Sequence, residues 1–170
     1  MAQAITPEIA SCPVGGTRPL SPEEVTLAAS VFGQAIDYAS VTIRRRKFFP
    51  LQPRKVTMAP LGHLHFHPLS GIYCDDFAHG TPHAQALFIH EMTHVWQVQT
   101  RGQWFLLLHR HPWCRYDYSL KPGWTLKQYG IEQQAMIVQH AFMLREGRPV
   151  PGAPPLEQYR NILPFSPFRD

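Results

Sequence analysis

Five consecutive residues, His90 to His94, read HEMTH and match the pattern HExxH. At 100° per residue of helix, His90 and His94 lie about 40° apart and one turn apart, so both imidazoles can bind one metal ion. Glu91 is rotated away from that ion, yet close enough to take a proton from a water molecule bound there. The pattern therefore predicts a zinc site in which Glu91 is the general base.

A chance match is the alternative, because ten histidines in 170 residues make such patterns easier to meet. The neighbours of the motif argue against chance: Phe88, Ile89, Val95 and Trp96 are all apolar. Two histidines and a glutamate buried among them without a metal would leave polar groups unpaired. We therefore expect a zinc ion. A catalytic zinc ion has three protein ligands and binds a water molecule in its fourth position, and the pKa of that water is about 7.

Two histidines do not complete a zinc site, so a third protein ligand must come from another element. We favour Glu132, which lies 38 residues after His94 in the first turns of the next predicted helix. Ala135 shares its helix face and would permit a close approach of the two helices. A surface glutamate that benefits from the helix dipole is the alternative. The other candidates for the third ligand are His140, His111, Asp117 and Cys114.

Three helices have clear start signals in the sequence. Ser21 followed by Pro22 and Glu24 forms a capping box and predicts a helix over roughly residues 22–36. Thr81 followed by proline predicts a second helix, which carries the HExxH motif and ends at Gly102. A Thr-x-x-Gln capping box at Thr125 predicts a third helix that ends at Gly147.

Between these helices the sequence predicts strands over residues 41–47 and 61–67, and an irregular connection over 103–124. This order predicts an α+β fold in which a small, mostly antiparallel sheet packs on the HExxH helix and on a second, ligand-bearing helix. We divide the chain into a flexible N-terminal arm (1–20), a zincin-like domain (21–147) and a proline-rich tail that packs on it (148–170). A short helix is expected near residues 156–163.

Composition excludes several classes of protein. A hydrophobic share of 44% excludes wholesale disorder, and the chain has no apolar run long enough to span a membrane. The N-terminus lacks the features of a Sec signal peptide, so we expect a cytoplasmic protein with no membrane partner. A net charge of +4 makes nucleic acid an unlikely partner, and the basic run at residues 44–47 is interpreted as a solvated strand end. A basic, nucleic-acid-associated protease is the remote alternative.

Two blocks of sequence carry a family resemblance: FIHEMTHVWQ from Phe88 to Gln97, and YGIEQQA from Tyr129 to Ala135. They resemble the small Vgr-related and Rhs-associated zinc metallopeptidases of the gluzincin-like group, over roughly residues 30–145. The resemblance implies a minimal thermolysin-like fold, zinc held by the two motif histidines and Glu132, and Glu91 as the base. The group often has an acidic residue four positions after the third ligand. Here that position is Met136, so His90 or His94 must be oriented otherwise.

The resulting expectation is a single-domain zinc metallopeptidase that hydrolyses a peptide or protein substrate. The alternative is a catalytically silent, zinc-binding adaptor or structural module associated with a secretion system. In either case a dedicated secretion system could export the protein. An intact Glu91 favours the enzyme, because a structural zinc site has no need of a base beside it.

Two further groups of residues carry open interpretations. His63, His65 and His67 alternate with Leu64 and Phe66, which predicts a strand with an apolar inner face and a polar outer face. A second metal site, or an edge that pairs with an extended substrate, is the alternative. A tyrosine hydroxyl could stabilise the oxyanion of a tetrahedral intermediate, and the candidates are Tyr116, Tyr118 and Tyr129. Residues 104–108 could line a hydrophobic subsite or form a covering loop.

Overall fold

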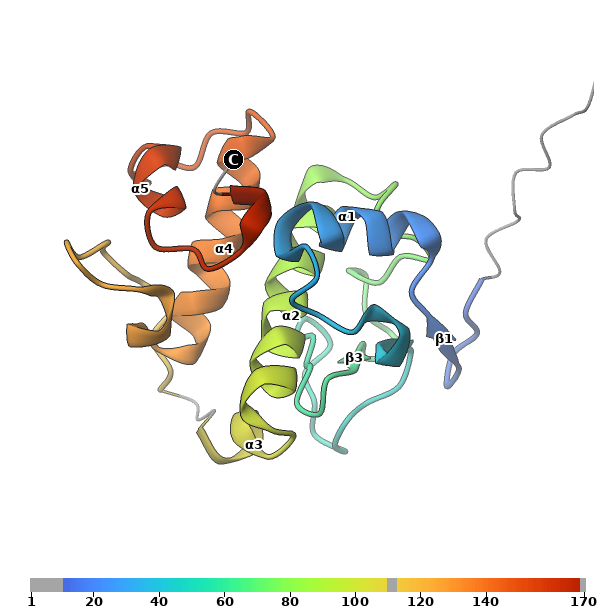
Figure 1. Cartoon of the computed structure of the whole chain (residues 1–170). Helices are drawn as coiled ribbons and strands as arrows, with labels where there is room; N and C mark the ends of the chain where they lie inside the picture. The colour runs from blue at the N-terminus through green and yellow to red at the C-terminus, as the bar shows by residue number, and fades with distance from the viewer. Residues whose placement is uncertain (1–10, 110–112, 169–170) are drawn as a thin grey trace, which may run out of the picture.

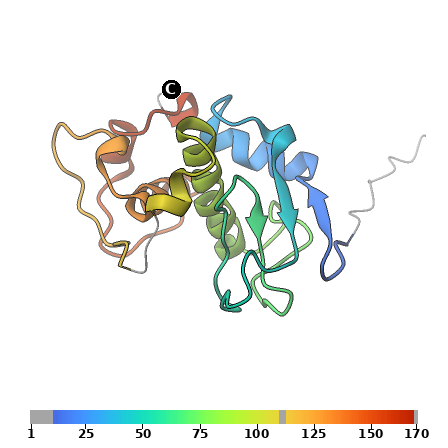
Figure 2. The same cartoon turned by 90° about the horizontal axis from the view of Figure 1, so that it is seen from below.

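The computed structural model describes residues 11–109 and 113–168. In this part of the chain five α-helices accompany a three-stranded sheet, which confirms the predicted α+β class. Helix α2 (Pro82–Arg101) lies in the middle of the molecule. The sheet and helix α1 (Pro22–Phe32) lie on one side of it, and α4 (Ile131–Arg145) and α5 (Leu156–Arg160) lie on the other (Figures 1 and 2).

Helix α2 begins and ends at the predicted residues. The Thr81 hydroxyl accepts a hydrogen bond from the amide of Ala84, and Pro82 occupies the first turn. Gly102, with φ of 95°, ends the helix in a conformation that other residues rarely adopt. Every side chain from Phe88 to Val98 is buried. This helix therefore holds the HExxH motif inside the protein.

The start of helix α4 differs from the prediction. The capping box of Thr125 and Gln128 is present, but it caps a single 3₁₀ turn, Leu126–Gln128. Tyr129 and Gly130 are then extended, and α4 begins at Ile131. Glycine is unfavourable inside a helix. Because Tyr129 and Gly130 are extended, the Tyr129 carbonyl can accept a hydrogen bond from the side-chain amide of Gln134. As a result, Glu132 occupies the first turn of α4 rather than its second.

Helix α1 is shorter than the predicted range of residues 22–36. Its capping box between Ser21 and Glu24 forms as expected. Gly33, with φ of 57°, ends the helix, and a Cβ atom there would lie 3.0 Å from the Ser166 hydroxyl. The positive φ and the close approach of the C-terminal segment both require glycine at this position.

A buried ion pair joins the first strand to α1. Arg18 donates two hydrogen bonds to the carboxylate of Glu24, at 2.7 and 2.8 Å. The same carboxylate accepts the backbone amides of Ser21 and Phe77, each at 2.9 Å. Burial lowers the pKa of Arg18, and the hydrogen bonds and charge of Glu24 outweigh it, so that the pKa is raised overall. The pair thus ties the sheet, α1 and the loop before α2 together.

The sheet is small and mixed. Its order is β1-β2-β3, with β1 (Thr17–Pro19) antiparallel to β2 (Thr42–Arg44) and β2 parallel to β3 (Leu64–His65). An isolated antiparallel bridge joins Met58 to His65. Strand β3 is shorter than the predicted range of 61–67, because Gly62, with φ of 81°, turns the chain just before it.

Both segments outside the predicted domain contribute to the packed structure. Residues 17–19 of the predicted arm form β1. The tail after residue 148 forms α5 and places four large side chains in the core: Tyr159, Leu163, Phe165 and Phe168. A short helix that the sequence did not predict, α3 (Phe105–His109), lies within the connection expected to be irregular.

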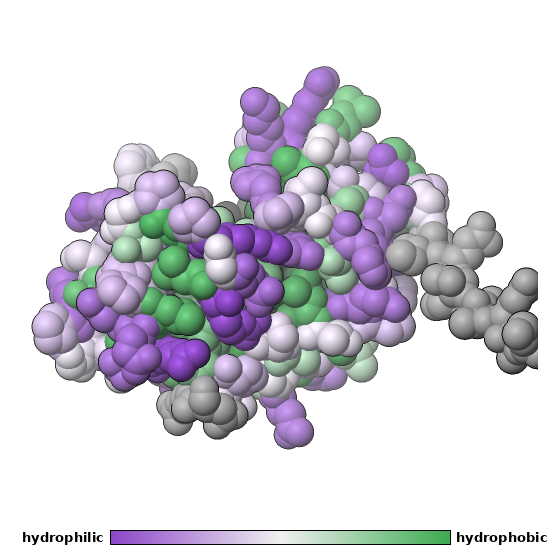
Figure 3. All heavy atoms as spheres, turned by 90° about the horizontal axis from the view of Figure 1, so that it is seen from above, coloured by the Kyte–Doolittle hydropathy of each residue, from purple (hydrophilic) through white to green (hydrophobic). Residues whose placement is uncertain are grey.

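The surface seen from above is mostly hydrophilic (Figure 3). Hydrophobic residues show through on the left of this view, the side where Figure 1 places α4 and α5. Within residues 11–109 and 113–168, no helix combines the length and the hydropathy needed to cross a membrane.

Candidate metal centre

Three buried side chains converge where α2 and α4 pack together. Oε2 of Glu132 lies 3.3 Å from Nε2 of His90 and 3.2 Å from Nε2 of His94. Their ligand atoms all lie within 4.8 Å of one another. Among the described residues, this is the one such group of three or more histidine, cysteine or acidic side chains. It could hold a metal ion.

A chain of side-chain amides holds His94 from behind. Nδ1 of His94 lies 2.9 Å from Oε1 of Gln97. The Gln97 amide nitrogen donates to the carbonyl of Ile131 and to Oε1 of Gln134, both at 3.0 Å. Gln134 in turn donates to the carbonyl of Tyr129, at 2.7 Å. The chain therefore links the imidazole to the backbone at the start of α4.

These hydrogen bonds decide which nitrogen of His94 carries the proton. Backbone carbonyls only accept, so both amide nitrogens must face them, and Oε1 of Gln97 must face His94. Nδ1 is then the donor, and Nε2 of the neutral ring turns a lone pair toward Glu132. Two acceptors 3.2 Å apart in a buried site repel each other unless a metal ion or a proton lies between them. A metal ion would satisfy all three ligands at once.

His90 is held in a similar way from α4. Its Nδ1 lies 3.0 Å from Oε1 of Gln139, which leaves Nε2 to face Glu132. The side-chain amides of Gln97 and Gln139 are thus the groups that orient the two imidazoles. Neither glutamine was predicted. Gln139 lies seven residues after Glu132, two turns along the same helix face, and this spacing was the available signal.

Glu91 lies in the same buried stretch of α2, next to His90 in the chain. The donor set beside it, two imidazole nitrogens and one carboxylate oxygen, is the set found in one class of catalytic zinc sites. Burial of a carboxylate beside such a set is costly in the absence of a cation. The chemistry of the residues present therefore fits zinc.

Comparison with known proteins agrees with this picture. No family model matches the chain. The type VI secretion system spike protein VgrG2b of Pseudomonas aeruginosa is 43% identical over 134 residues, which cover 74% of this chain. The solved effector domain of the same VgrG2b has a TM-score of 0.66 and 37% identity, and the match covers 82% of this chain and 78% of that domain. The chain belongs to the VgrG2b effector-domain family.

This membership confirms the Vgr-related part of the resemblance seen in the sequence. The match to the whole spike protein covers 13% of its length. This chain therefore matches most of the length of the effector domain, but only a small part of the complete spike protein.

The other described candidates for the third ligand do not belong to this group of three side chains. His140 is hydrogen-bonded through Nδ1 to the Tyr118 hydroxyl, at 2.7 Å. Asp117 pairs with Arg115 on the surface. Cys114 lies 3.7 Å from the carbonyl of His109, and His111 lies outside the described residues. Of the candidates that the structure describes, Glu132 joins the two histidines.

One of the three candidate tyrosines, Tyr118, lies in a network of side-chain hydrogen bonds. The Tyr118 hydroxyl lies 2.7 Å from both His140 Nδ1 and the Tyr159 hydroxyl, at the edge of a cavity of about 300 Å³. Met136, one turn after Glu132, lines the same cavity. Burial raises the pKa of Tyr118 and lowers that of His140. Both side chains are therefore neutral at neutral pH.

The remaining two tyrosines have other surroundings, and the histidine strand does not match its prediction. Tyr129 accepts a hydrogen bond from the Lys121 amide, while Tyr116 is half exposed. His65 and His67 are buried, as are Leu64 and Phe66, so the predicted polar outer face is wrong. The ring of Phe48 packs edge-to-face against His65, with ring centroids 5.3 Å apart, and the backbone of Met58 pairs with His65 along the strand. The three histidines form no metal group with one another within the described residues.

Proposed function

We propose that this VgrG2b-family domain is a zinc-dependent peptidase and that a type VI secretion system carries it. The observation that supports the proposal best is the pair of imidazoles whose Nε2 atoms both lie within 3.3 Å of one buried carboxylate, with Glu91 beside them. Membership of the effector-domain family supports the link to secretion. The partner of the site is a peptide or protein substrate.

Each residue of the site has a role in this proposal. His90, His94 and Glu132 would hold the zinc ion. When bound, zinc polarises a peptide carbonyl and lowers the pKa of a bound water to about 7. Glu91 accepts the proton from the attacking water and returns it to the leaving amine. We assign the role of donor to the developing oxyanion to Tyr118, which lines a cavity together with Met136, one turn after Glu132.

The alternative is a zinc-binding module of the secretion apparatus without catalysis. Structural zinc sites are usually closed by four protein ligands, whereas catalytic sites have three protein ligands and an open position. The described residues supply three, and a carboxylate that is not needed as a ligand lies beside them. These two features favour the enzyme.

The decisive experiment measures zinc content and casein hydrolysis for the wild-type chain, Glu132→Ala and Glu91→Gln. We expect about one zinc per chain in the wild type and in Glu91→Gln, and little in Glu132→Ala. Only the wild type should hydrolyse casein. A wild-type chain that binds zinc but does not hydrolyse casein would favour the zinc-binding module without catalysis. A wild-type chain that binds no zinc would exclude both the peptidase and the zinc-binding module.

A further inference from the structure

Exposed hydrophobic side chains are concentrated in one part of the chain. Ten large hydrophobic side chains are exposed among the described residues, and five of them fall between residues 104 and 116. Trp104 is 60% exposed, Leu108 is 78% exposed and Trp113 is 81% exposed. Leu107 and Tyr116 complete the group. Single exposed hydrophobic residues are ordinary on protein surfaces, but such a cluster indicates a binding surface.

The orientation of α3 produces this cluster. Leu106 points into the protein and is fully buried, while the rings of Phe105 and His109 stack on each other, 4.7 Å apart, at the edge of a cavity. The outer face therefore consists of Trp104, Leu107 and Leu108. A helix normally presents polar residues to water, so packing within the domain does not explain this face. We call Trp104, Leu107, Leu108 and Trp113 the apolar surface.

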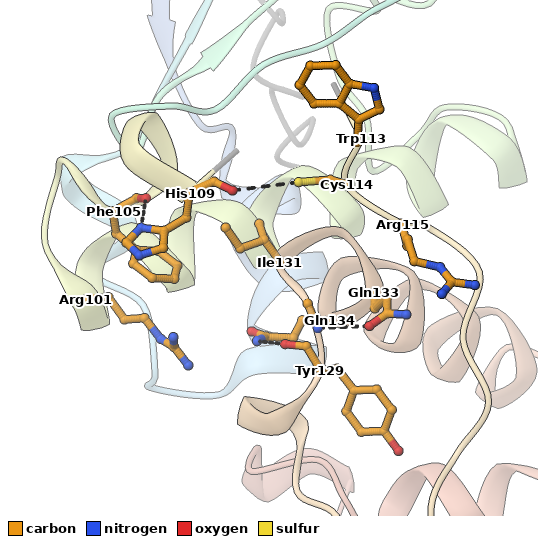
Figure 4. Close-up of a pocket in the computed structure, with 11 residues that line it drawn as sticks. Arg101, Phe105, His109, Trp113, Cys114, Arg115, Tyr129, Ile131, Gln133 and Gln134 are labelled. Atoms are coloured by element: carbon orange, nitrogen blue, oxygen red, sulfur yellow. Dashed lines mark hydrogen bonds between the residues drawn. The ribbon is translucent and has the colours of Figure 1, made fainter. Parts of the chain in front are cut away.

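A basic cavity of about 520 Å³ adjoins the apolar surface. Arg101, His109 and Arg115 line it, and none of its eleven lining residues is acidic. The Arg101 guanidinium lies 4.7 Å from the centre of the Phe105 ring, and Arg115 pairs with the exposed Asp117 outside the cavity. Figure 4 shows the two arginines on opposite sides of the cavity, with the Trp113 indole turned away from it.

We propose that this part of the domain binds the surface of an anionic phospholipid membrane. The apolar surface would enter the interfacial layer, where tryptophan is favoured because its ring is apolar and its N–H can still donate a hydrogen bond. The cavity would receive a headgroup phosphate, which arginine binds well. Binding of this kind needs no membrane-spanning helix. The sequence-based expectation of no membrane partner depended on the lack of a spanning run and did not address this mode.

Size and charge favour a membrane over a protein partner. The four side chains of the apolar surface offer roughly 500 Å² together, judged from the areas that such side chains bury. A standard protein interface needs about 800 Å² from each partner. A lipid interface has no such requirement, because a few inserted side chains and a few basic residues act together.

The test is co-sedimentation of the whole chain with vesicles of phosphatidylcholine alone and of phosphatidylcholine mixed with phosphatidylglycerol. We expect binding to the mixed vesicles, weakened by salt. The double substitutions Trp104→Ser with Trp113→Ser, and Arg101→Gln with Arg115→Gln, should each lower the affinity at least about tenfold. Leu51→Ser is the matched control, since Leu51 is equally exposed but distant in sequence, and its binding should not change. Circular dichroism checks that every variant is folded.

Three results would overturn the proposal. The first is that the wild type binds to neither kind of vesicle. Binding of soluble glycerol phosphate alone would count as this result, because it would show a site for a free phosphate and not for a membrane. The second is equal binding to both vesicle types, which would remove the role of the basic cavity. The third is an equal loss of binding in Leu51→Ser and in the tryptophan variant. None of these results depends on peptidase activity, so the proposed function is tested separately.

Discussion

At the scale of single residues, the two histidines of the candidate metal centre are held in position by side chains that are not themselves candidate ligands. Oε1 of Gln97 accepts a hydrogen bond from Nδ1 of His94, and the Gln97 amide nitrogen is fixed by two acceptors, one of them a backbone carbonyl. Oε1 of Gln139, on the opposite helix, lies 3.0 Å from Nδ1 of His90. Both nitrogens that face Glu132 are therefore set in position before any ion binds.

We expect Gln97→Leu to weaken zinc binding by about 10–100-fold, because the imidazole of His94 loses the acceptor that selects its tautomer. The measurement is a competition titration with a chromophoric chelator. Gln99→Leu is the control, since Gln99 lies on the same helix but bonds to Asp37 on the surface. Equal affinity in the Gln97 variant and the wild type would mean that the amide chain plays no part in metal binding.

Glu91→Gln removes the proposed base but keeps the shape of the side chain. We expect the rate of casein hydrolysis to fall by about 10²–10⁴-fold, the usual contribution of a general base, while zinc content stays unchanged. The measurement pairs a hydrolysis assay with elemental analysis of the same sample. Turnover at the wild-type rate would exclude Glu91 as the base.

The sequence predicted the residues that converge here but not those that hold them in place. His90, His94 and Glu132 have chemically distinctive side chains at helical spacing, so a motif reveals them. Gln97 and Gln139 are ordinary helix residues whose role depends on how α2 and α4 pack. That packing is a long-range property and leaves little trace in local sequence.

At the scale of elements, local signals predicted helix starts well and other boundaries less well. The caps at Ser21 and Thr81 form as expected, because each depends on residues adjacent in sequence. The cap at Thr125 also forms, yet its helix ends after one turn. The carbonyl of Tyr129, which follows that turn, accepts a hydrogen bond from the side chain of Gln134, five residues further along the chain. Helix α3 carries no capping signal, and it was missed.

Arg18→Met breaks the buried ion pair between β1 and α1. We expect a loss of about 3 kcal/mol of unfolding free energy, because the Glu24 carboxylate stays buried without its countercharge. The measurement is equilibrium unfolding in urea. Arg115→Gln is the matched control: its ion pair with Asp117 is exposed, and the unfolding midpoint should not move. Equal midpoints in all three proteins would show that the buried pair adds nothing to stability.

At the scale of the whole molecule, α2 lies between the sheet on one side and α4 on the other, and the three side chains of the site meet where α2 and α4 pack together. On the sheet side of the molecule, His65 of β3 is buried and its ring packs edge-to-face against Phe48. Neither the parallel pairing of β2 with β3 nor the burial of His65 could be predicted, because both depend on contacts between distant segments.

Burial of His65 makes stability depend on pH. Burial first, and then the charges of Arg44, His63 and Arg46, lower its pKa to about 4 from an unfolded value near 6.5. The unfolded chain therefore takes up a proton first as the pH falls. Stability is fully present above about pH 6.5 and is lost towards pH 4, by roughly 3 kcal/mol.

The check is chemical unfolding across this pH range for the wild type and His65→Asn. The difference between their free energies of unfolding should shrink or change sign as the pH falls, because only the wild type carries this titrating group. Other histidines contribute equally to both proteins and cancel. A difference that is constant between pH 6.5 and pH 4 would contradict the prediction.

The amide chain behind His94 also has a spectroscopic consequence. The side-chain NH₂ groups of Gln97 and Gln134 are buried and hydrogen-bonded, so their protons should exchange slowly with solvent and give resolved NMR signals. Most glutamine side chains are solvated and lack such signals after transfer to heavy water. These two residues are therefore reporters of the candidate metal centre, and their signals can be followed without a substrate.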